Sequence, residues 1–168
     1  SAMVVEVRPE NWKQSSKYGN LAALQFQKDI EQKAFKTTGS INAPAQRVED
    51  FIQNKVSGIL PRTSYQPGIS SHNLHDILPN FIAQSLQQGL IDFGKKMKGY
   101  RTNDAIIVGV ESRTSSPVRI PRNKETLQHT QLSNLYPCGE GAGYAGGIVS
   151  AAIDGMRCAQ AIALNNKL

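Results

Sequence analysis

The chain has 168 residues, 39% of them hydrophobic and 19% charged, which is typical of a soluble globular protein of about one domain. Its 19 Lys and Arg residues exceed its 13 Asp and Glu, and the resulting charge of +6 suits an anionic ligand or nucleic acid. No stretch approaches the roughly 20 apolar residues of a membrane span, and two cysteines are too few for a disulfide framework, so we expect a cytoplasmic protein with reduced thiols and no membrane partner.

The N-terminal region predicts one short strand followed by two helices. Residues 4–7 predict a strand that begins abruptly, which favours a piece of a longer protein, and the polar residues 11–20 predict a loop. Helical spacing of apolar residues predicts a helix over 21–36. A second helix is predicted over 44–55, because Pro44 is well placed in a first helical turn.

The middle of the chain predicts further helices, divided by proline and glycine. Apolar residues from Leu74 onward follow a helical period, but Pro79 would break a helix in its interior. We therefore predict a short turn first and a helix that begins at Pro79. Gly89 and Gly94 predict an interruption and a further short helix before Gly99.

The character of the sequence changes at Ala105. Residues 105–113 are rich in β-branched side chains and predict a strand, 114–117 predict a turn, and 118–120 predict a second short strand. Residues 121–134 are polar and predict a surface loop. Together with the helices upstream, these elements predict an α+β fold divided into a mostly helical portion, 1–104, and a second portion, 105–168.

Glycine is dense in residues 139–147, between a strand predicted from Leu135 and a final Ala-rich helix. Gly141, Gly143 and Gly146 satisfy the pattern G-x-G-x-x-G, in which glycine lets the backbone approach a phosphate. In a dinucleotide-binding domain this pattern precedes a second strand and an acidic residue roughly 20 residues on. The chain ends too soon for both, which argues against an NAD-binding domain built on this loop.

Two other groups of residues are candidates for chemistry. Glu111 to Pro117 places Arg113 beside several hydroxyl groups, and this segment is either an anion clamp or an ordinary turn. Cys138 precedes the glycines, where a small buried hydrophobic role is favoured over a chemical one. No metal site is predicted, because His72 and His75 have no further ligands nearby in the sequence.

The basic residues are scattered, apart from the run of Lys and Arg in 95–101. A charge run of this kind is usually a solvated face, so nucleic acid is not favoured as a partner. A helical binding module with a basic surface for nucleic acid or a protein nevertheless stays open as the alternative function.

Several motifs resemble the C-terminal part of bacterial FAD-dependent dehydrogenases with a glutathione-reductase-like Rossmann fold, whose substrate is undefined. The resemblance is specific in Gly109–Ile120, Leu135–Ile148 and Ser150–Gly155. It is looser in Ala43–Phe51 and Leu74–Phe81. It therefore covers most of the chain.

The resemblance implies roles for particular residues. Glu140 corresponds to the acidic residue that meets the ribityl side of FAD, and Ile148 marks the helix start whose amides face the flavin. The backbone of the loop would approach FAD at its glycines: Gly139, Gly141, Gly143, Gly146 and Gly147. Arg113, Thr114 and Ser115, with Ser116 after them, would lie toward the substrate. No catalytic residue is named, because hydride transfer by a flavin requires no acid or base from the protein.

The resemblance also implies an organisation. Residues 1–104 correspond to a helical substrate or cap-domain portion, and 105–168 to the last strand–loop–helix of the FAD-binding domain. The family's ADP-binding motif is not in this sequence. We therefore expect FAD to bind in a full-length parent, and we expect this chain alone to bind FAD poorly or not at all and to be inactive. The implied partner is the rest of the same flavoprotein, and unpaired strand edges would permit a homodimer.

Overall fold

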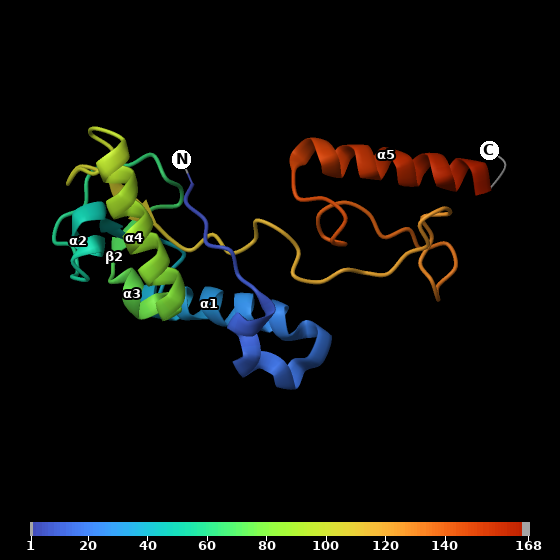
Figure 1. Ribbon diagram of the computed structural model, residues 1–168, viewed down its shortest axis with the longest axis horizontal. Coiled ribbons are helices and arrows are strands. Elements are labelled where there is room, and N and C mark those ends of the chain that lie inside the picture. The colour runs from blue at the N-terminus through green and yellow to red at the C-terminus, as the bar shows by residue number, and fades with distance from the viewer. Residues whose placement is uncertain (1, 166–168) are drawn as a thin grey trace. The chain divides into compact units, whose positions relative to one another are not determined.

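Residues 2–165 are described by the computed structural model, in which helices and a small mixed sheet give the predicted α+β class (Figure 1). The chain folds into two compact units. The first unit comprises Ser1–Asn11 and Phe26–Ser112, and the second comprises Trp12–Gln25 and Arg113–Leu168. The predicted division between residues 104 and 105 concerns domains of a longer protein and stays a prediction.

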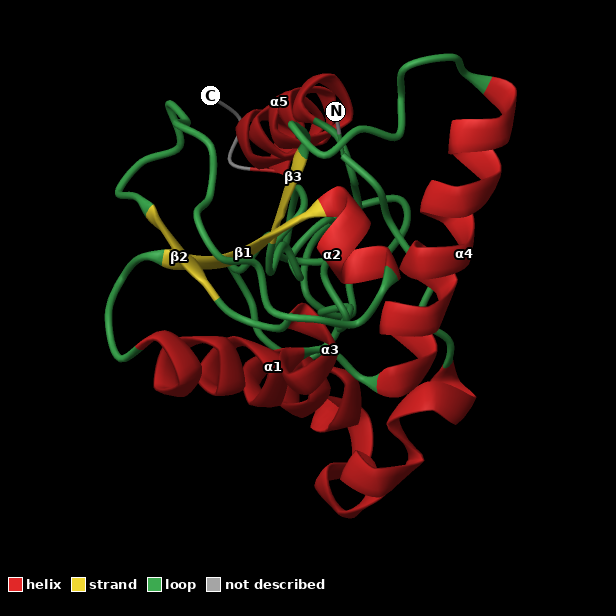
Figure 2. Ribbon diagram, turned by 90° about the vertical axis from the view of Figure 1, so that its left-hand side faces the viewer, coloured by secondary structure: helices red, strands yellow, loops and turns green. Residues whose placement is uncertain are grey.

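The sheet of the first unit has three short strands, with β1 (Ala43–Arg47) in the centre (Figure 2). Strand β2 (Ile69–Ser71) pairs with it in parallel, and β3 (Ile106–Val108) pairs with it in the antiparallel sense. Of the strand predicted over 105–113, only β3 forms. Ala45 lies opposite both Ser71 and Val108.

The predicted helix over 44–55 is wrong in its first half. Pro44 lies in the central strand, and only α2 (Val48–Ile52) is helical. Proline cannot donate to a ladder, but its carbonyl still accepts a hydrogen bond, here from the Gly109 N–H at 3.0 Å. Tertiary pairing thus overrides a proline that is locally suited to a helix start.

The core of the first unit is formed beside the sheet by residues of four helices: α1 (Ala22–Thr38), α2, α3 (Leu74–Ile77) and α4 (Asn80–Lys96). Phe51 is fully buried at its centre. Gln46 is also fully buried, and its side chain donates to the Lys55 carbonyl at 2.8 Å and accepts from the Leu74 N–H at 2.7 Å. This buried amide joins the central strand to α3, and both ends of it are paired.

Helix prediction succeeded where local signals were strong. Helix α1 (Ala22–Thr38) confirms the segment predicted over 21–36. The break before Pro79 is also confirmed, because α3 ends at Ile77 and Pro79 caps α4.

The predicted interruption at Gly89 and Gly94 is wrong, because α4 runs through both glycines. A glycine costs a helix only about 1 kcal/mol, which packing outweighs. At Gly94 the helix gains a close approach, since a Cβ there would lie 2.8 Å from the Arg101 Cβ.

Two predictions at the N-terminus are also wrong. Residues 4–7 do not form a strand, and the predicted loop over 11–20 lies within a 3-10 helix, η1 (Pro9–Leu21), that is kinked at Trp12 and Gly19. A strand needs a hydrogen-bonded neighbour, and no described residue pairs with 4–7 as a strand.

The second unit contains α5 (Ile148–Asn165), which confirms the final predicted helix, and a long irregular segment before it. The strands predicted over 118–120 and from Leu135 are wrong. Between residues 113 and 147 the described backbone forms no strand, and its β-type pairing is limited to an isolated bridge between Arg122 and His129. The glycine loop therefore follows irregular backbone, because the described residues of this unit provide no neighbouring strand with which it could form a ladder.

Candidate functional site

The glycine loop, residues 139–147, is the candidate site, and its backbone conformation explains two of its glycines. The N–H of Gly143 donates to the Glu140 carbonyl at 2.9 Å, and the N–H of Tyr144 donates to the Gly139 carbonyl at 3.0 Å. Gly139 and Gly143 adopt φ values of 68° and 82°, a region in which L-residues with side chains are strained. These two glycines are required by the turn itself.

Gly143 is also required by packing against the preceding segment. A Cβ at this position would lie 2.5 Å from the Val118 carbonyl oxygen, which is a severe overlap. Nearby, the N–H of Ile120 donates to the Ala142 carbonyl at 3.1 Å. The loop is thus held against residues 118–120 by close backbone contact.

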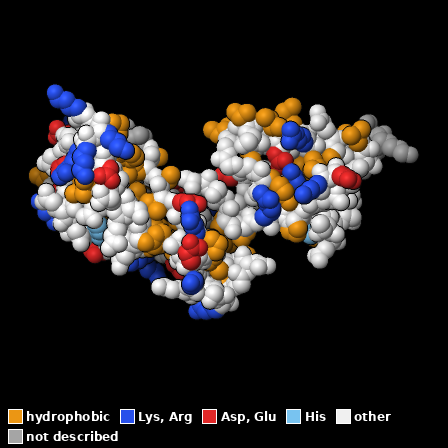
Figure 3. Space-filling view, in the orientation of Figure 1, with side chains coloured by type: hydrophobic (Ala, Val, Ile, Leu, Met, Phe, Trp, Pro, Cys, Tyr) orange, Lys and Arg blue, Asp and Glu red, His pale blue; other side chains and the backbone are white. Residues whose placement is uncertain are grey.

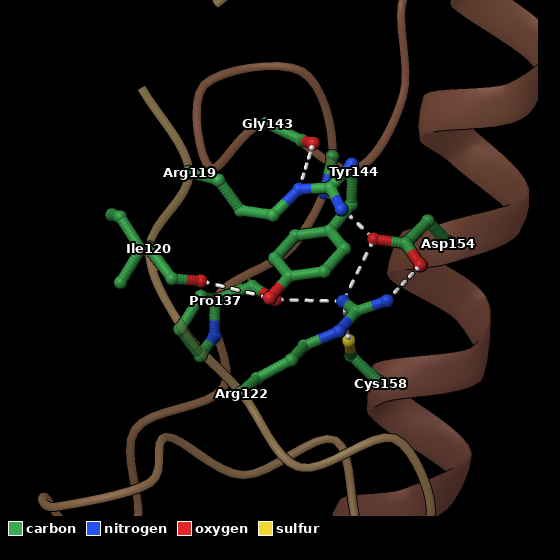
Figure 4. Close-up of polar contacts among 9 residues, drawn as sticks. Arg119, Ile120, Arg122, Pro137, Gly143, Tyr144, Asp154 and Cys158 are labelled. Atoms are coloured by element: carbon green, nitrogen blue, oxygen red, sulfur yellow. Dashed lines mark hydrogen bonds and ion pairs between the residues drawn. The ribbon is translucent and has the colours of Figure 1, made fainter.

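A buried ion pair joins this assembly to α5 (Figure 4). The Arg122 guanidinium donates to both carboxylate oxygens of Asp154, at 2.6 and 2.9 Å, and the two side chains are only 9% and 11% exposed. Asp154 also accepts the N–H of Gly139 at 2.9 Å, and Arg122 donates to the Pro137 carbonyl at 2.7 Å. The ion pair therefore holds the backbone at the start of the loop, because Arg122 bonds Pro137 and Asp154 bonds Gly139.

The charges of this pair are mutually stabilised. The hydrogen bond from Arg122 lowers the pKa of the Asp154 carboxyl, burial opposes this, and the Gly139 N–H adds to the lowering. The same hydrogen bond raises the pKa of Arg122. Sequence reasoning missed this pair. The sequence signal that could have revealed the pair was Asp154 itself, the one carboxylate in α5, most of whose residues are small or apolar.

Tyr144 completes the support of the loop. The Arg122 guanidinium carbon lies 3.6 Å from the centroid of the Tyr144 ring, and that of Arg119 lies 4.9 Å from it, so both cations contact the aromatic ring. The Tyr144 hydroxyl donates to the Ile120 carbonyl at 2.8 Å, and Arg119 donates to the Gly143 carbonyl at 2.9 Å. These contacts hold Gly143 and Tyr144 of the loop against residues 119–122.

Other residues of the predicted site face open space. Gly141 and Gly146 have no positive φ, and a Cβ at either would meet no atom within 4 Å. Glu140 is exposed, and Ile148, at the start of α5, is 92% exposed. Gly147 N–H is capped by the Ser150 hydroxyl at 3.2 Å. Because the first N–H groups of a helix have no partner within it, amides remain at this end for an outside acceptor.

The chain's own fold thus accounts for Gly139 and Gly143 but not for Gly141 and Gly146. The latter leave room at the backbone that a side chain would fill. An exposed carboxylate, open backbone and a helix start are groups that fit the ribityl and pyrophosphate portions of FAD.

In the predicted turn at 113–116, Ser116 contacts the glycine loop. The Ser116 hydroxyl donates to the Val118 carbonyl at 2.8 Å and lies 3.3 Å from the Gly141 carbonyl, so it has the backbone-bonding role of a turn hydroxyl. Arg113, Thr114 and Ser115 are exposed. Their substrate-side role stays a prediction.

The basic run at 95–101 is partly neutralised. Lys95 contacts Asp92 at 3.2 Å, and Arg101 forms a two-pronged pair with Glu49 at 2.6 and 2.7 Å. On the face drawn in Figure 3, Lys and Arg side chains are dispersed among other residues.

Two further findings concern the described residues alone. Within residues 2–165, no three His, Cys, Asp or Glu side chains gather in a way that would hold a metal ion. In the same part of the chain, no helix has both the length and the apolar character needed to cross a membrane.

Comparison with known proteins gives two matches. A family model described as "FAD-dependent protein, C-terminal domain-like" matches residues 1–114. An uncharacterized protein of Clostridium beijerinckii (strain ATCC 51743 / NCIMB 8052) is 46% identical over 165 residues, which are 96% of this chain and 30% of that protein. The chain therefore spans about a third of the length of this relative.

Proposed function

The chain belongs to the "FAD-dependent protein, C-terminal domain-like" family, and from this premise we propose that it is the C-terminal part of an FAD-dependent oxidoreductase of the dehydrogenase type. In such a protein FAD supplies the redox chemistry, and the polypeptide supplies binding, orientation and electrostatics. The match covers only 30% of the Clostridium protein, which supports the proposal that this chain is part of a longer protein.

The observation that carries the proposal is the pair of glycines that the fold of this chain does not require. Gly141 and Gly146 leave open space at the backbone of a loop that is otherwise tightly held. In the proposed site the backbone at these glycines contacts FAD, the amides at the start of α5 donate toward its phosphates, and Glu140 accepts hydrogen bonds from ribityl hydroxyls. The Arg122–Asp154 pair touches no cofactor in this scheme and only positions the loop.

The rest of the same polypeptide is the proposed partner, and α5 offers a surface for it. The helix buries Asp154 and Cys158, whereas its other face exposes large apolar side chains. The exposed set is Ile148, Val149, Ile153, Met156 and Leu164. Exposed apolar area of this kind usually marks a contact surface, and the greater length of the Clostridium relative supports an occupant from the same chain. A homodimer through the edges of β2 and β3 stays a second, weaker proposal.

Two ion pairs among the described residues weigh against the alternative of a basic nucleic-acid module. Lys95 and Arg101, two cations of the only basic run, are engaged by carboxylates. A nucleic-acid surface needs such cations to be available for phosphates.

The test is FAD affinity in the longer protein that contains this sequence. Glu140→Gln is expected to weaken FAD binding by about 1.5–3 kcal/mol, the value of a hydrogen bond to a charged group. The matched control is Glu125→Gln, because Glu125 is also an exposed carboxylate of the second unit. Flavin absorbance after gel filtration and equilibrium titration measures the effect.

Two outcomes would contradict the proposal. Unchanged FAD affinity in Glu140→Gln removes the assigned role of that carboxylate. A longer protein that purifies without flavin, takes up none on titration, and instead binds RNA in a salt-sensitive way would favour the alternative.

A further inference from the structure

We propose that Cys138 and Cys158 form a thiol–disulfide exchange site, at which a low-molecular-weight disulfide such as oxidised glutathione links them into an intramolecular bridge. The bridge would tie the residue before the glycine loop to α5. It does not depend on the proposed flavin function, because it needs only the second unit.

The geometry that carries this proposal is the anchoring of both cysteines by one ion pair. Cys138 lies between the Pro137 carbonyl, which accepts from Arg122 at 2.7 Å, and the Gly139 N–H, which donates to Asp154 at 2.9 Å. Cys158 is one helical turn after Asp154 on α5, so both side chains lie on the same helical face. The Arg122 Nη1 is 3.4 Å from the Cys158 Sγ (Figure 4).

One nitrogen also joins the surroundings of the two cysteines. Arg122 Nη1 donates to the carbonyl of Pro137, the residue before Cys138, and lies 3.4 Å from the Cys158 Sγ. The nearby Cys138 side chain contributes to raising the pKa of the Cys158 thiol. A disulfide requires two sulfurs brought together by their backbones, and here neighbouring hydrogen bonds fix both backbones. The sequence has no other cysteine that competes for either partner.

The two cysteines differ in accessibility in the way that exchange requires. Cys138 is exposed, whereas Cys158 is buried with 3% of its surface accessible. An exposed thiol meets the external disulfide, and a buried neighbour resolves the mixed disulfide that results. The difference in solvent accessibility therefore sets the order of reaction, in which Cys138 reacts first with the external disulfide.

The electrostatic environment of Cys158 also favours Cys138 as the thiol that reacts first. Burial raises the pKa of the Cys158 thiol, and the adjacent Arg122 guanidinium acts in the opposite direction. Cys158 is thus a poor first nucleophile at neutral pH. Once a mixed disulfide stands beside it, the guanidinium 3.4 Å away favours the thiolate that must form.

The reaction balances with one external disulfide. The Cys138 thiol loses its proton to solvent, and its sulfur attacks oxidised glutathione, breaking the S–S bond and releasing one glutathione thiolate that takes up a proton. The Cys158 thiol then loses its proton, and its sulfur attacks the Cys138 sulfur, releasing the second glutathione. Two cysteine thiols are oxidised by two electrons, and one glutathione disulfide is reduced to two thiols.

The test uses the purified chain with oxidised glutathione, followed by acid quenching and mass spectrometry. The wild type is expected to lose the mass of two hydrogen atoms and both maleimide-reactive thiols, and dithiothreitol should restore them. Cys158→Ser should instead accumulate one stable glutathione adduct, and Cys138→Ser should react far more slowly. Circular dichroism verifies that both variants retain their helices.

A second measurement isolates the contribution of the fold. Ring closure in the native chain is expected to be at least about tenfold faster than in urea, because prior positioning raises the effective concentration of the resolving thiol. Equal rates in the two conditions would overturn the proposal. It would equally be overturned by a wild type that stops at the glutathione adduct, or that forms only disulfide-linked dimers.

Discussion

In the second unit the carboxylate of Asp154 joins Arg122 and the Gly139 N–H, and its side chain is only 11% exposed. Breaking a buried pair leaves a charge without compensation and costs about 3–5 kcal/mol. We expect Asp154→Asn to lower the free energy of unfolding by about that amount, measured by urea denaturation and circular dichroism.

The matched control for this prediction is the Arg101–Glu49 pair, which has equally good geometry but is 38% and 22% exposed. Glu49→Gln should cost only about 0.2–1 kcal/mol, as exposed pairs do. Similar losses in the two variants would mean that burial does not determine the strength of the Asp154 contact.

The lowered pKa of Asp154 gives a prediction about pH. A carboxyl whose pKa is lower in the folded than in the unfolded state binds fewer protons when folded, so it stabilises the protein above its unfolded pKa of about 3.9. This contribution is lost as the pH falls through the folded pKa.

The measurement is the difference in unfolding free energy between the wild type and Asp154→Asn as a function of pH. The difference should be constant near neutral pH and shrink between about pH 5 and pH 2, because only the wild type titrates at this position. A difference that stays constant over the whole range would contradict the assigned shift.

The glycines of the loop provide a pair of variants that separates folding from binding. Gly143→Ala is expected to destabilise the chain by at least about 1–2 kcal/mol, the cost of a left-handed conformation, and the overlap with the Val118 oxygen adds to it. Gly141→Ala meets open space at an ordinary φ and should leave stability unchanged.

In the longer protein the same Gly141→Ala is expected to weaken FAD binding, because its methyl group occupies the space proposed for the cofactor. Thermal melting measures the first effect and flavin titration the second. If Gly141→Ala destabilises the chain as much as Gly143→Ala, or leaves FAD binding unchanged, Gly141 is not a cofactor contact.

At the scale of elements, α5 carries the prediction about partner contact. Met156 is 64% exposed in the apolar face of this helix. Met156→Lys should preserve the helix, because lysine and methionine have similar helix propensity. It should reduce self-association and the binding of a hydrophobic dye by the isolated chain.

In the longer protein the same change should destabilise the fold, by about the 2–5 kcal/mol of losing a buried methionine, if the rest of the chain covers this face. Leu132→Lys is the control, because Leu132 is 57% exposed in the irregular segment, outside α5. An equal effect of the two substitutions in the longer protein would argue against a covered α5.

The elements also differ in how far they follow from sequence. Helix α1 and the break at Pro79 were predicted because their signals act within a few residues. The strand β1 was missed because Pro44 locally suits a helix, whereas its pairing partners lie in β2 and β3, far along the chain. Strand formation depends on such neighbours.

At the scale of the whole molecule, we expect this chain alone to bind FAD weakly or not at all. The proposed site contributes one carboxylate, open backbone and one helix start, and the ADP-binding motif that the family resemblance requires is not in this sequence. Titration of FAD fluorescence with the purified chain measures this, and the longer protein is the positive control. Tight binding by the chain alone would show that the second unit is a complete site.

The sequence by itself determined the α+β class, helices α1 and α5, the position of the glycine loop and the family to which the chain belongs. These follow from apolar periodicity, from proline and glycine chemistry, and from motifs that are contiguous in the chain. It also marked Glu140 as a candidate residue, whose role in binding FAD stays a prediction.

Only the tertiary structure decided which glycines the fold needs and which it leaves open, and it alone revealed what holds the loop. Arg122 and Asp154 are separated by 32 positions, and the same guanidinium nitrogen lies 3.4 Å from the sulfur of Cys158. No local pattern encodes these contacts, because their free energy comes from burial and from partners that meet only after the chain has folded.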